Sequence, residues 1–140
     1  MGIDLRLLPC EHWNDRDDSP LWGYSHTILD LGRVGEDAWN AFQTMVKPHL
    51  VKLPAGHNVS SYVGALVAEG HHKGERIYGT IRDKDAYGEA YMFVEAQHLL
   101  PWLEEHFCYD GHHGHGHYQT AIVAFVRALP SDTKIVLDWH

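Results

Sequence analysis

The sequence predicts an α+β domain, in which a small mixed or antiparallel sheet of three to five strands includes both termini and about four helices pack mainly on one face. Three observations predict this class. Residues 3–8 and 134–140 alternate apolar and polar side chains with the period of a strand. Residues 118–129 repeat apolar side chains with the period of a helix. The length of 140 residues is typical of one domain, which we expect to span residues 1–140.

The N-terminal part of the chain is predicted to form two strands separated by a polar loop. Residues 3–8 place Asp4 and Arg6 on the face opposite three aliphatic side chains. Residues 11–20 are almost entirely polar, which is typical of a loop. Residues 24–31 are rich in aromatic and β-branched side chains, which favours the second strand.

The first predicted helix begins at Glu36, where an acidic side chain suits the positive end of the helix dipole. Trp39, Phe42 and Val46 then form one apolar stripe that needs a partner surface. Pro48 is expected to stop this helix, because proline has no backbone N–H and clashes with the preceding turn.

Three further segments are predicted to be helical. Residues 59–69 carry a narrow apolar face between a capping residue and a glycine. Residues 95–107 contain Pro101, so this helix starts near Leu100, kinks there or breaks into two pieces. Residues 118–129 show the clearest helical pattern in the chain.

Two short strands and a closing strand complete the prediction. Residues 76–81 and 86–94 are expected to form a hairpin around residues 83–85. Residues 134–140 follow a turn and end the chain as a strand.

Composition excludes several classes of function. The chain has 11 Lys+Arg against 19 Asp+Glu, a formal net charge of -8, so it repels phosphate backbones and is not expected to bind nucleic acids generally. No secretory signal is visible and no apolar stretch approaches the ~20 residues that span a bilayer. We therefore expect a cytoplasmic protein without membrane contact, with Cys10 and Cys108 as free thiols.

Four segments resemble small hypothetical proteins that tailed bacteriophages and prophages encode: MGIDLRLLP, SHTILDLGR, YGTIRDKDAYGEA and ALPSDTKIVLDWH. These proteins have no assigned activity, so no functional residue is carried over from them. The resemblance implies a phage accessory protein that acts in the cytoplasm of a bacterial host.

A glycine- and histidine-rich loop is the segment most typical of metal chemistry. Neutral imidazole binds zinc, nickel and copper, and the glycines let alternate rings converge on one ion. The candidate ligands are His112, His113, His115 and His117. A further ligand can come from Cys108, Asp110 or His106. The alternative is a flexible loop that binds zinc or nickel adventitiously, because glycine neighbours supply no groups that hold the imidazoles in place.

Polar side chains recur on one face of three predicted strands. The pairs are Asp4 with Arg6, His26 with Asp30, and Asp138 with His140. If these faces align, His26, Asp30, Asp138 and His140 are candidates for acid–base catalysis. His26 and Asp30 lie about 13 Å apart along a strand and cannot touch. The alternative, which the pattern favours, is an ordinary polar outer face of a half-exposed antiparallel sheet.

Arg33 lies where a predicted strand meets a predicted helix and can hold an anion there. Glu36 and Asp37 follow at once and oppose a phosphate, which favours a plain turn. If the polar face binds a ligand, Asp4, Arg6 and Arg33 are the candidate contacts.

Two functional hypotheses remain open. The first is a non-enzymatic accessory protein that binds a host or phage protein, with a homodimer as a plausible assembly. The second is a transition-metal-binding protein, or a small metal-dependent hydrolase, that uses zinc or nickel in loop 112–117. A third option, the sequestration of a small nucleotide, needs a basic pocket built from Arg6, Arg33, Arg76 and Arg82.

Overall fold

The computed structural model describes residues 3–10, 12–13, 21–25, 27–53, 58–61, 80–82, 84–108 and 116–140. The strands are β1 (Ile3–Pro9), β2 (His12–Trp13), β3 (Leu21–Ser25), β4 (Leu29–Val34), β5 (Val51–Lys52), β6 (Asn58–Ser61), β7 (Thr80–Arg82), β8 (Met92–Glu95) and β9 (Lys134–Trp139). The helices are α1 (Glu36–Met45), α2 (Ala96–His106) and α3 (His117–Ala128), with the short 3-10 helix η1 (Lys47–His49).

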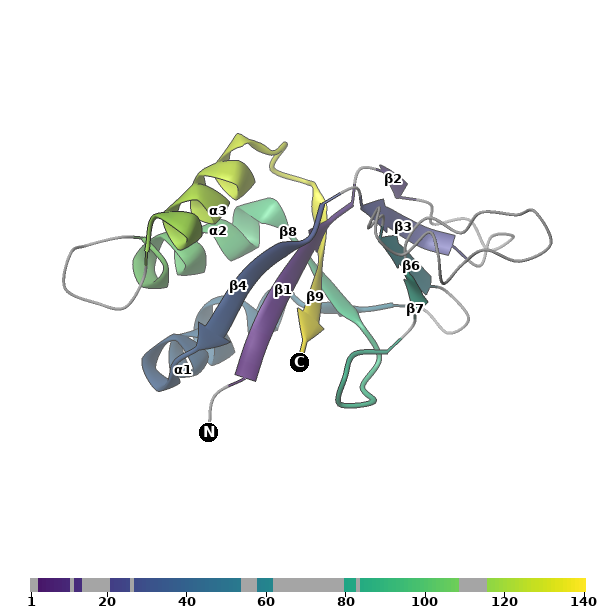
Figure 1. Ribbon diagram of the computed structural model, residues 1–140, viewed down its shortest axis with the longest axis horizontal. Helices are drawn as coiled ribbons and strands as arrows, with labels where there is room; N and C mark the ends of the chain where they lie inside the picture. Colours follow the sequence, from purple (N-terminus) through teal and green to yellow (C-terminus); the bar gives the residue numbers. More distant parts are fainter. Residues whose placement is uncertain are drawn as a thin grey trace.

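The predicted α+β class is confirmed. Five strands form one sheet in the order β4-β1-β9-β8-β5, and every neighbouring pair is antiparallel. The two terminal strands are neighbours near the centre of this sheet. The backbones of Asp4 and His140 exchange two hydrogen bonds of 2.9 Å. The start of β1 and the end of β9 therefore lie side by side (Figure 1).

The three helices cover one face of this sheet (Figure 1). The apolar side of β1 and β9 packs there against Phe42 of α1, Trp102 of α2 and Val123 of α3, all buried. Burying a side chain of this size contributes about 1.5–3 kcal/mol relative to leaving it exposed. The Trp102 indole also donates a 2.8 Å hydrogen bond to the carbonyl oxygen of Ala38, which ties α2 to α1.

The opposite face of the sheet carries a second apolar cluster: Leu8, Cys10, Leu53, Tyr91, Phe93 and Val136. A second sheet, in the order β2-β3-β6-β7, lies on this side of the molecule (Figure 1). The expectation of a half-exposed polar outer face is therefore wrong for β9. Val136 is 0% exposed and Asp138 is 1% exposed.

Several predicted elements need correction. Residues 24–31 contribute to two strands, β3 and β4, which belong to different sheets. Residues 59–61 lie in β6 rather than in a helix, and residues 62–70 lie outside the described part of the chain. β6 consists of asparagine, valine and two serines, whose side chains lower helix propensity. Within the described residues, three α-helices are present instead of about four.

The predicted hairpin also differs from the structure. β7 and β8 lie in different sheets and do not pair. The tight turn falls a few residues later, where an isolated antiparallel bridge joins Lys84 to Ala90. Asp85 stabilises this turn, because its Oδ1 accepts hydrogen bonds from the backbone N–H groups of Tyr87 and Glu89.

The proline positions in the helices are accommodated in different ways. α1 ends at Met45, and Pro48 lies in the first turn of η1, where its missing N–H costs little. α2 runs from Ala96 to His106 through Pro101, so it begins before Leu100 and does not break into two pieces. None of the helices in the described ranges combines the length and apolar character needed to cross a membrane.

Candidate functional site

The polar side chains of β1, β4 and β9 lie on one face of the five-stranded sheet, as the strand pattern suggested. In one row across the sheet, Arg6 lies between Asp30 of β4 and Asp138 of β9. Residues opposite each other on paired strands share a face. Asp30 and Asp138 therefore occupy the positions on either side of Arg6 on this face.

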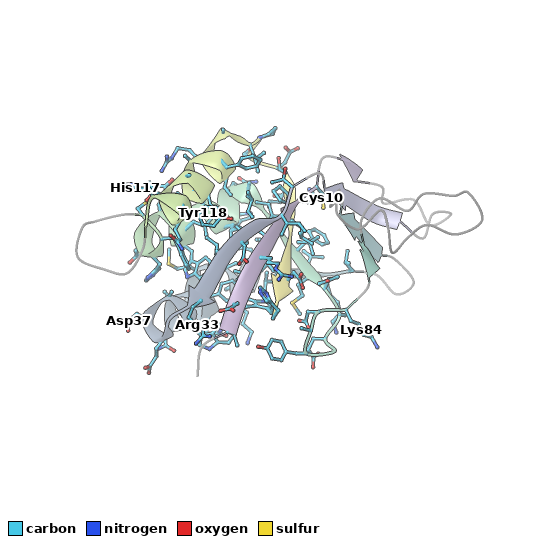
Figure 2. All side chains as sticks on the ribbon, viewed as in Figure 1. Cys10, Arg33, Asp37, Lys84, His117 and Tyr118 are labelled. Carbon is cyan, nitrogen blue, oxygen red and sulfur yellow. The ribbon has the colours of Figure 1, made fainter. Side chains whose placement is uncertain are left out.

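The adjacent row places Asp4 between Arg33 of β4 and His140, which follows β9. Arg33 Nε donates to Asp4 Oδ1 at 3.0 Å, and Figure 2 shows Arg33 close to the N-terminal end of β1. The two side chains are 67% and 36% exposed, so this ion pair contributes little to stability. His140 Nδ1 is buried and has no hydrogen-bond partner among the described residues.

A bulge in β4 brings Asp30 and Arg33 to the same face. Asp30 and Arg33 are three positions apart, so a regular strand would point their side chains to opposite faces. The register shifts between Leu5 and Arg6, which leaves Leu31 as an extra residue. Gly32 adopts a φ of 73° at this point, and its N–H donates to Asp30 Oδ1 at 2.9 Å. The bulge is the reason why this cluster contains Arg33.

Asp138 is a buried carboxylate in this cluster. The Tyr91 hydroxyl donates to Asp138 Oδ1 at 3.3 Å, and both side chains are 1% exposed. A buried carboxylate needs such a partner, because its desolvation is otherwise costly. Sequence reasoning missed Tyr91, since nothing in the strand pattern links it to a residue 47 positions later.

The remaining sequence candidates are only partly described. His26 lies outside the described residues, and so do His112, His113 and His115. His117 is the first residue of α3 and is exposed (Figure 2). Within the described ranges, no group of three or more His, Cys, Asp or Glu side chains is placed to hold a metal ion.

A stacked pair of histidines lies elsewhere on the surface. The rings of His49 and His98 are parallel, with centroids 4.0 Å apart, and Glu95 lies 3.9 Å from His98. Hydrogen bonds from Lys134 and Gln97 lower the pKa of the Glu95 carboxyl. Glu95 is thus already bonded to these two side chains, which fits a structural contact.

The two cysteines differ in environment. Cys10 is buried in the second apolar cluster, and this burial raises the pKa of its thiol to about 12. Cys108 is partly buried after α2. Both are free thiols, as expected from the sequence. The Cys10 thiol stays protonated at neutral pH and is unsuited to act as a nucleophile.

A pocket of about 280 Å³ lies between α1 and the turn that precedes β8, on the helical side of the sheet. Trp39, Phe42 and Trp139 form its aromatic wall, and Leu137 and Met92 form its floor. The ring of Trp39 stacks on Phe42 at 5.9 Å and meets Trp139 edge to face at 5.4 Å. We call this space the aromatic pocket.

Charged side chains line the same pocket. Lys47 and Lys52 come from the segment after α1, and Asp85 and Glu89 come from the turn. Both lysines are exposed, and neither forms an ion pair within the described part of the chain. The two lysine charges are therefore available to a ligand.

The polar face and the aromatic pocket are connected through β9. Trp139 points into the pocket, whereas Asp138 points to the other face of the sheet. The Ala86 N–H donates to the Trp139 carbonyl at 3.3 Å, and Tyr91 binds Asp138. These two bonds fasten the turn, which forms one wall of the pocket, to the last strand.

The sequence pattern placed Trp39 on an apolar stripe that needs a partner surface, and this description was incomplete. Trp39 is 38% exposed and Trp139 is partly buried. The sequence signal that could have indicated the aromatic pocket was the position of Trp39 on α1, followed in the chain by Lys47 and Lys52. It could not be used, because the register that brings Trp139 beside α1 depends on long-range strand pairing. No family model, curated protein or solved structure matches the chain.

Proposed function

We propose that the protein is a non-enzymatic binding protein that holds a small ligand in the aromatic pocket. The observation that carries this proposal is the pocket itself: a space of about 280 Å³ with an apolar floor, three aromatic rings and four charged side chains. Ligand sites are typically concave and mainly apolar, with a few polar groups that orient the ligand.

The rigidity of the pocket supports this proposal. Phe42 contacts Trp39, Trp102 and Trp139 at ring distances of 5.9, 5.1 and 5.3 Å, so the aromatic wall is part of the core. A wall that is already ordered loses little conformational entropy when a ligand binds.

The polar face has a different role in this proposal. Each of its three carboxylates already accepts a hydrogen bond: Asp4 from Arg33, Asp30 from Gly32 and Asp138 from Tyr91. These bonds order the sheet and hold the turn beside the pocket. We therefore assign Asp30 and Asp138 a structural role rather than a catalytic one.

The resemblance of four segments to phage-encoded proteins supports a proposal about where the protein acts. We propose that the chain acts as a phage accessory protein in a bacterial cytoplasm, where the bound ligand or a host or phage protein is its partner. Binding of zinc or nickel by the histidine-rich loop remains the alternative, and a metal analysis tests it separately.

The pocket is tested by titrating ¹⁵N-labelled protein with a set of small aromatic compounds and recording the indole N–H signals. Binding in the pocket shifts the signals of Trp39 and Trp139 and leaves that of Trp102, which is buried in the core, unchanged. The variants Trp39→Phe, Trp102→Phe and Trp139→Phe assign these three signals among those of the five tryptophans.

Two variants serve as a matched pair in the same titration. Trp39→Ala removes part of the aromatic wall and is expected to abolish the shifts. Phe125→Ala removes an aromatic ring that is similarly exposed, at 41%, but lies on α3 away from the pocket, and it is expected to retain them. Shifts that survive Trp39→Ala, or the absence of any shift across the set, would overturn the proposal.

A further inference from the structure

The charges around the aromatic pocket indicate which ligand it fits. Lys47 and Lys52 supply two positive charges, and Asp85 and Glu89 supply two negative ones. A simple anion is attracted by the lysines but repelled by the carboxylates, and a simple cation experiences the reverse. A ligand that carries both charges gains from both pairs.

The four charged groups differ in how freely they can turn toward a ligand. Asp85 is partly fixed, because its Oδ1 accepts two backbone hydrogen bonds within the turn. Lys47, Lys52 and Glu89 are exposed. Two lysine ammonium groups can approach a carboxylate, and Glu89 can approach an ammonium group.

The apolar part of the pocket selects the rest of the ligand. Trp39 and Trp139 lie nearly perpendicular, at 86°, and a flat ring can stack on one while it meets the edge of the other. The volume of about 280 Å³ lies just below the usual range of ligand sites, which runs from about 300 to 1,000 Å³. This size suits one ring with a short charged group and excludes a dinucleotide.

We propose that the aromatic pocket binds a free aromatic amino acid, with the ring against Trp39 and Trp139, the carboxylate toward Lys47 and Lys52, and the ammonium group toward Glu89 and Asp85. This inference rests on the proposed function, since it names the ligand class of the same pocket. It adds that recognition requires both charges as well as the ring.

The test compares three probes by isothermal titration calorimetry on the full chain. L-phenylalanine carries the ring and both charges, N-acetyl-L-phenylalaninamide carries the ring without charges, and L-alanine carries the charges without the ring. L-phenylalanine is expected to bind at least about tenfold more tightly than either of the others, the ratio expected from losing one charge-assisted contact or the buried ring.

Charge variants test the two ends of the ligand separately. The double variant Lys47→Ala/Lys52→Ala is expected to weaken L-phenylalanine binding about tenfold, and Glu89→Gln is expected to weaken it severalfold. Lys84→Ala is the matched control, because this exposed lysine lies in the same turn but does not line the pocket (Figure 2). All four side chains are exposed, so these variants are expected to fold, and their thermal unfolding checks this.

The outcomes separate this inference from the proposed function. Equal affinity for L-phenylalanine and N-acetyl-L-phenylalaninamide would overturn it and indicate that the pocket takes an aromatic side chain within a peptide. Binding of other aromatic compounds without any binding of L-phenylalanine would overturn it while the pocket function stands. If no aromatic compound binds, both proposals fail.

Discussion

The Tyr91 hydroxyl donates a hydrogen bond of 3.3 Å to the Asp138 carboxylate, and both side chains are buried on the face of the sheet opposite the helices. This bond joins the end of the turn that lines the aromatic pocket to the last strand of the chain. We therefore expect stability and the proposed ligand binding to depend on the same contact.

Tyr91→Phe removes this bond and leaves the ring in place. We expect a loss of about 1–3 kcal/mol in the free energy of unfolding, since a buried carboxylate loses a donor. We also expect weaker ligand binding in the aromatic pocket, because the turn is less firmly held. Urea unfolding measures the first effect. Tyr87→Phe changes the same group on a side chain that is 56% exposed, so it should have almost no effect. Equal stabilities of the two variants would contradict the structural role of Tyr91.

The bulge at Gly32 gives a second prediction. Gly32 has a φ of 73°, where a residue with a Cβ is strained, whereas Gly35 has a φ of -73° and an open position. Gly32→Ala is expected to cost about 1–2 kcal/mol of stability. Gly35→Ala is expected to change stability by less than about 1 kcal/mol, because the lower entropy of the unfolded chain is offset by the poorer preference of alanine for the N-cap of α1. Chemical denaturation of both variants provides the comparison. A Gly32→Ala protein as stable as the parent would show that the bulge does not require glycine.

The two terminal strands were predictable from the sequence. The alternation of residues 3–8 and 134–140 was sufficient to predict both terminal strands, a shared face for Asp4 and Arg6, and a shared face for Asp138 and His140. The alignment of these two faces follows from the pairing of β1 with β9, which alternation does not encode. Alternation is a local property, and it determines which side chains share a face of a strand once the strand forms.

Other features depend on contacts that the pattern does not encode. The placement of Arg33 on the polar face required a bulge. The contact of Trp139 with Trp39 required the pairing of β9 with β1. The division of residues 24–31 between two sheets also depends on partners far along the chain, because short segments rich in β-branched residues are compatible with either sheet. The site was therefore predictable only in part: its polar face was expected, and the aromatic pocket was not.

The Cys10 thiol gives a prediction for alkaline pH. Burial raises its pKa from 9.0 to about 12, so the folded protein holds this proton more tightly than the unfolded chain does. The resulting stability is fully present below about pH 9 and is lost as the pH rises from 9 to 12. The added slope approaches about 1.4 kcal/mol per pH unit in this range.

The matched comparison for Cys10 is the Cys10→Ala variant. Its free energy of unfolding should decline less steeply than that of the parent between pH 9 and pH 11, although it starts lower because a buried side chain has been shortened. Identical slopes would contradict a raised thiol pKa. At pH 8, a thiol reagent should label Cys108 before Cys10, because Cys108 is only partly buried.

The histidine-rich loop gives the prediction that separates the two functional hypotheses. The described end of this loop places His117 in the first turn of α3 with an exposed side chain, and Gly116 precedes it. The glycines beside the loop histidines carry no side chains that could hold the imidazole rings toward one ion. We expect protein purified without nickel resin to contain much less than one transition-metal ion per chain by elemental mass spectrometry.

The control for the metal analysis changes His112, His113, His115 and His117 together to Ala. If the loop is a surface feature, this variant should keep the thermal stability of the parent and its binding in the aromatic pocket. About one zinc or nickel ion per chain in the parent, lost in the variant together with stability, would contradict this prediction. It would favour a metal-binding protein and would make assays of metal-dependent hydrolysis the next experiment.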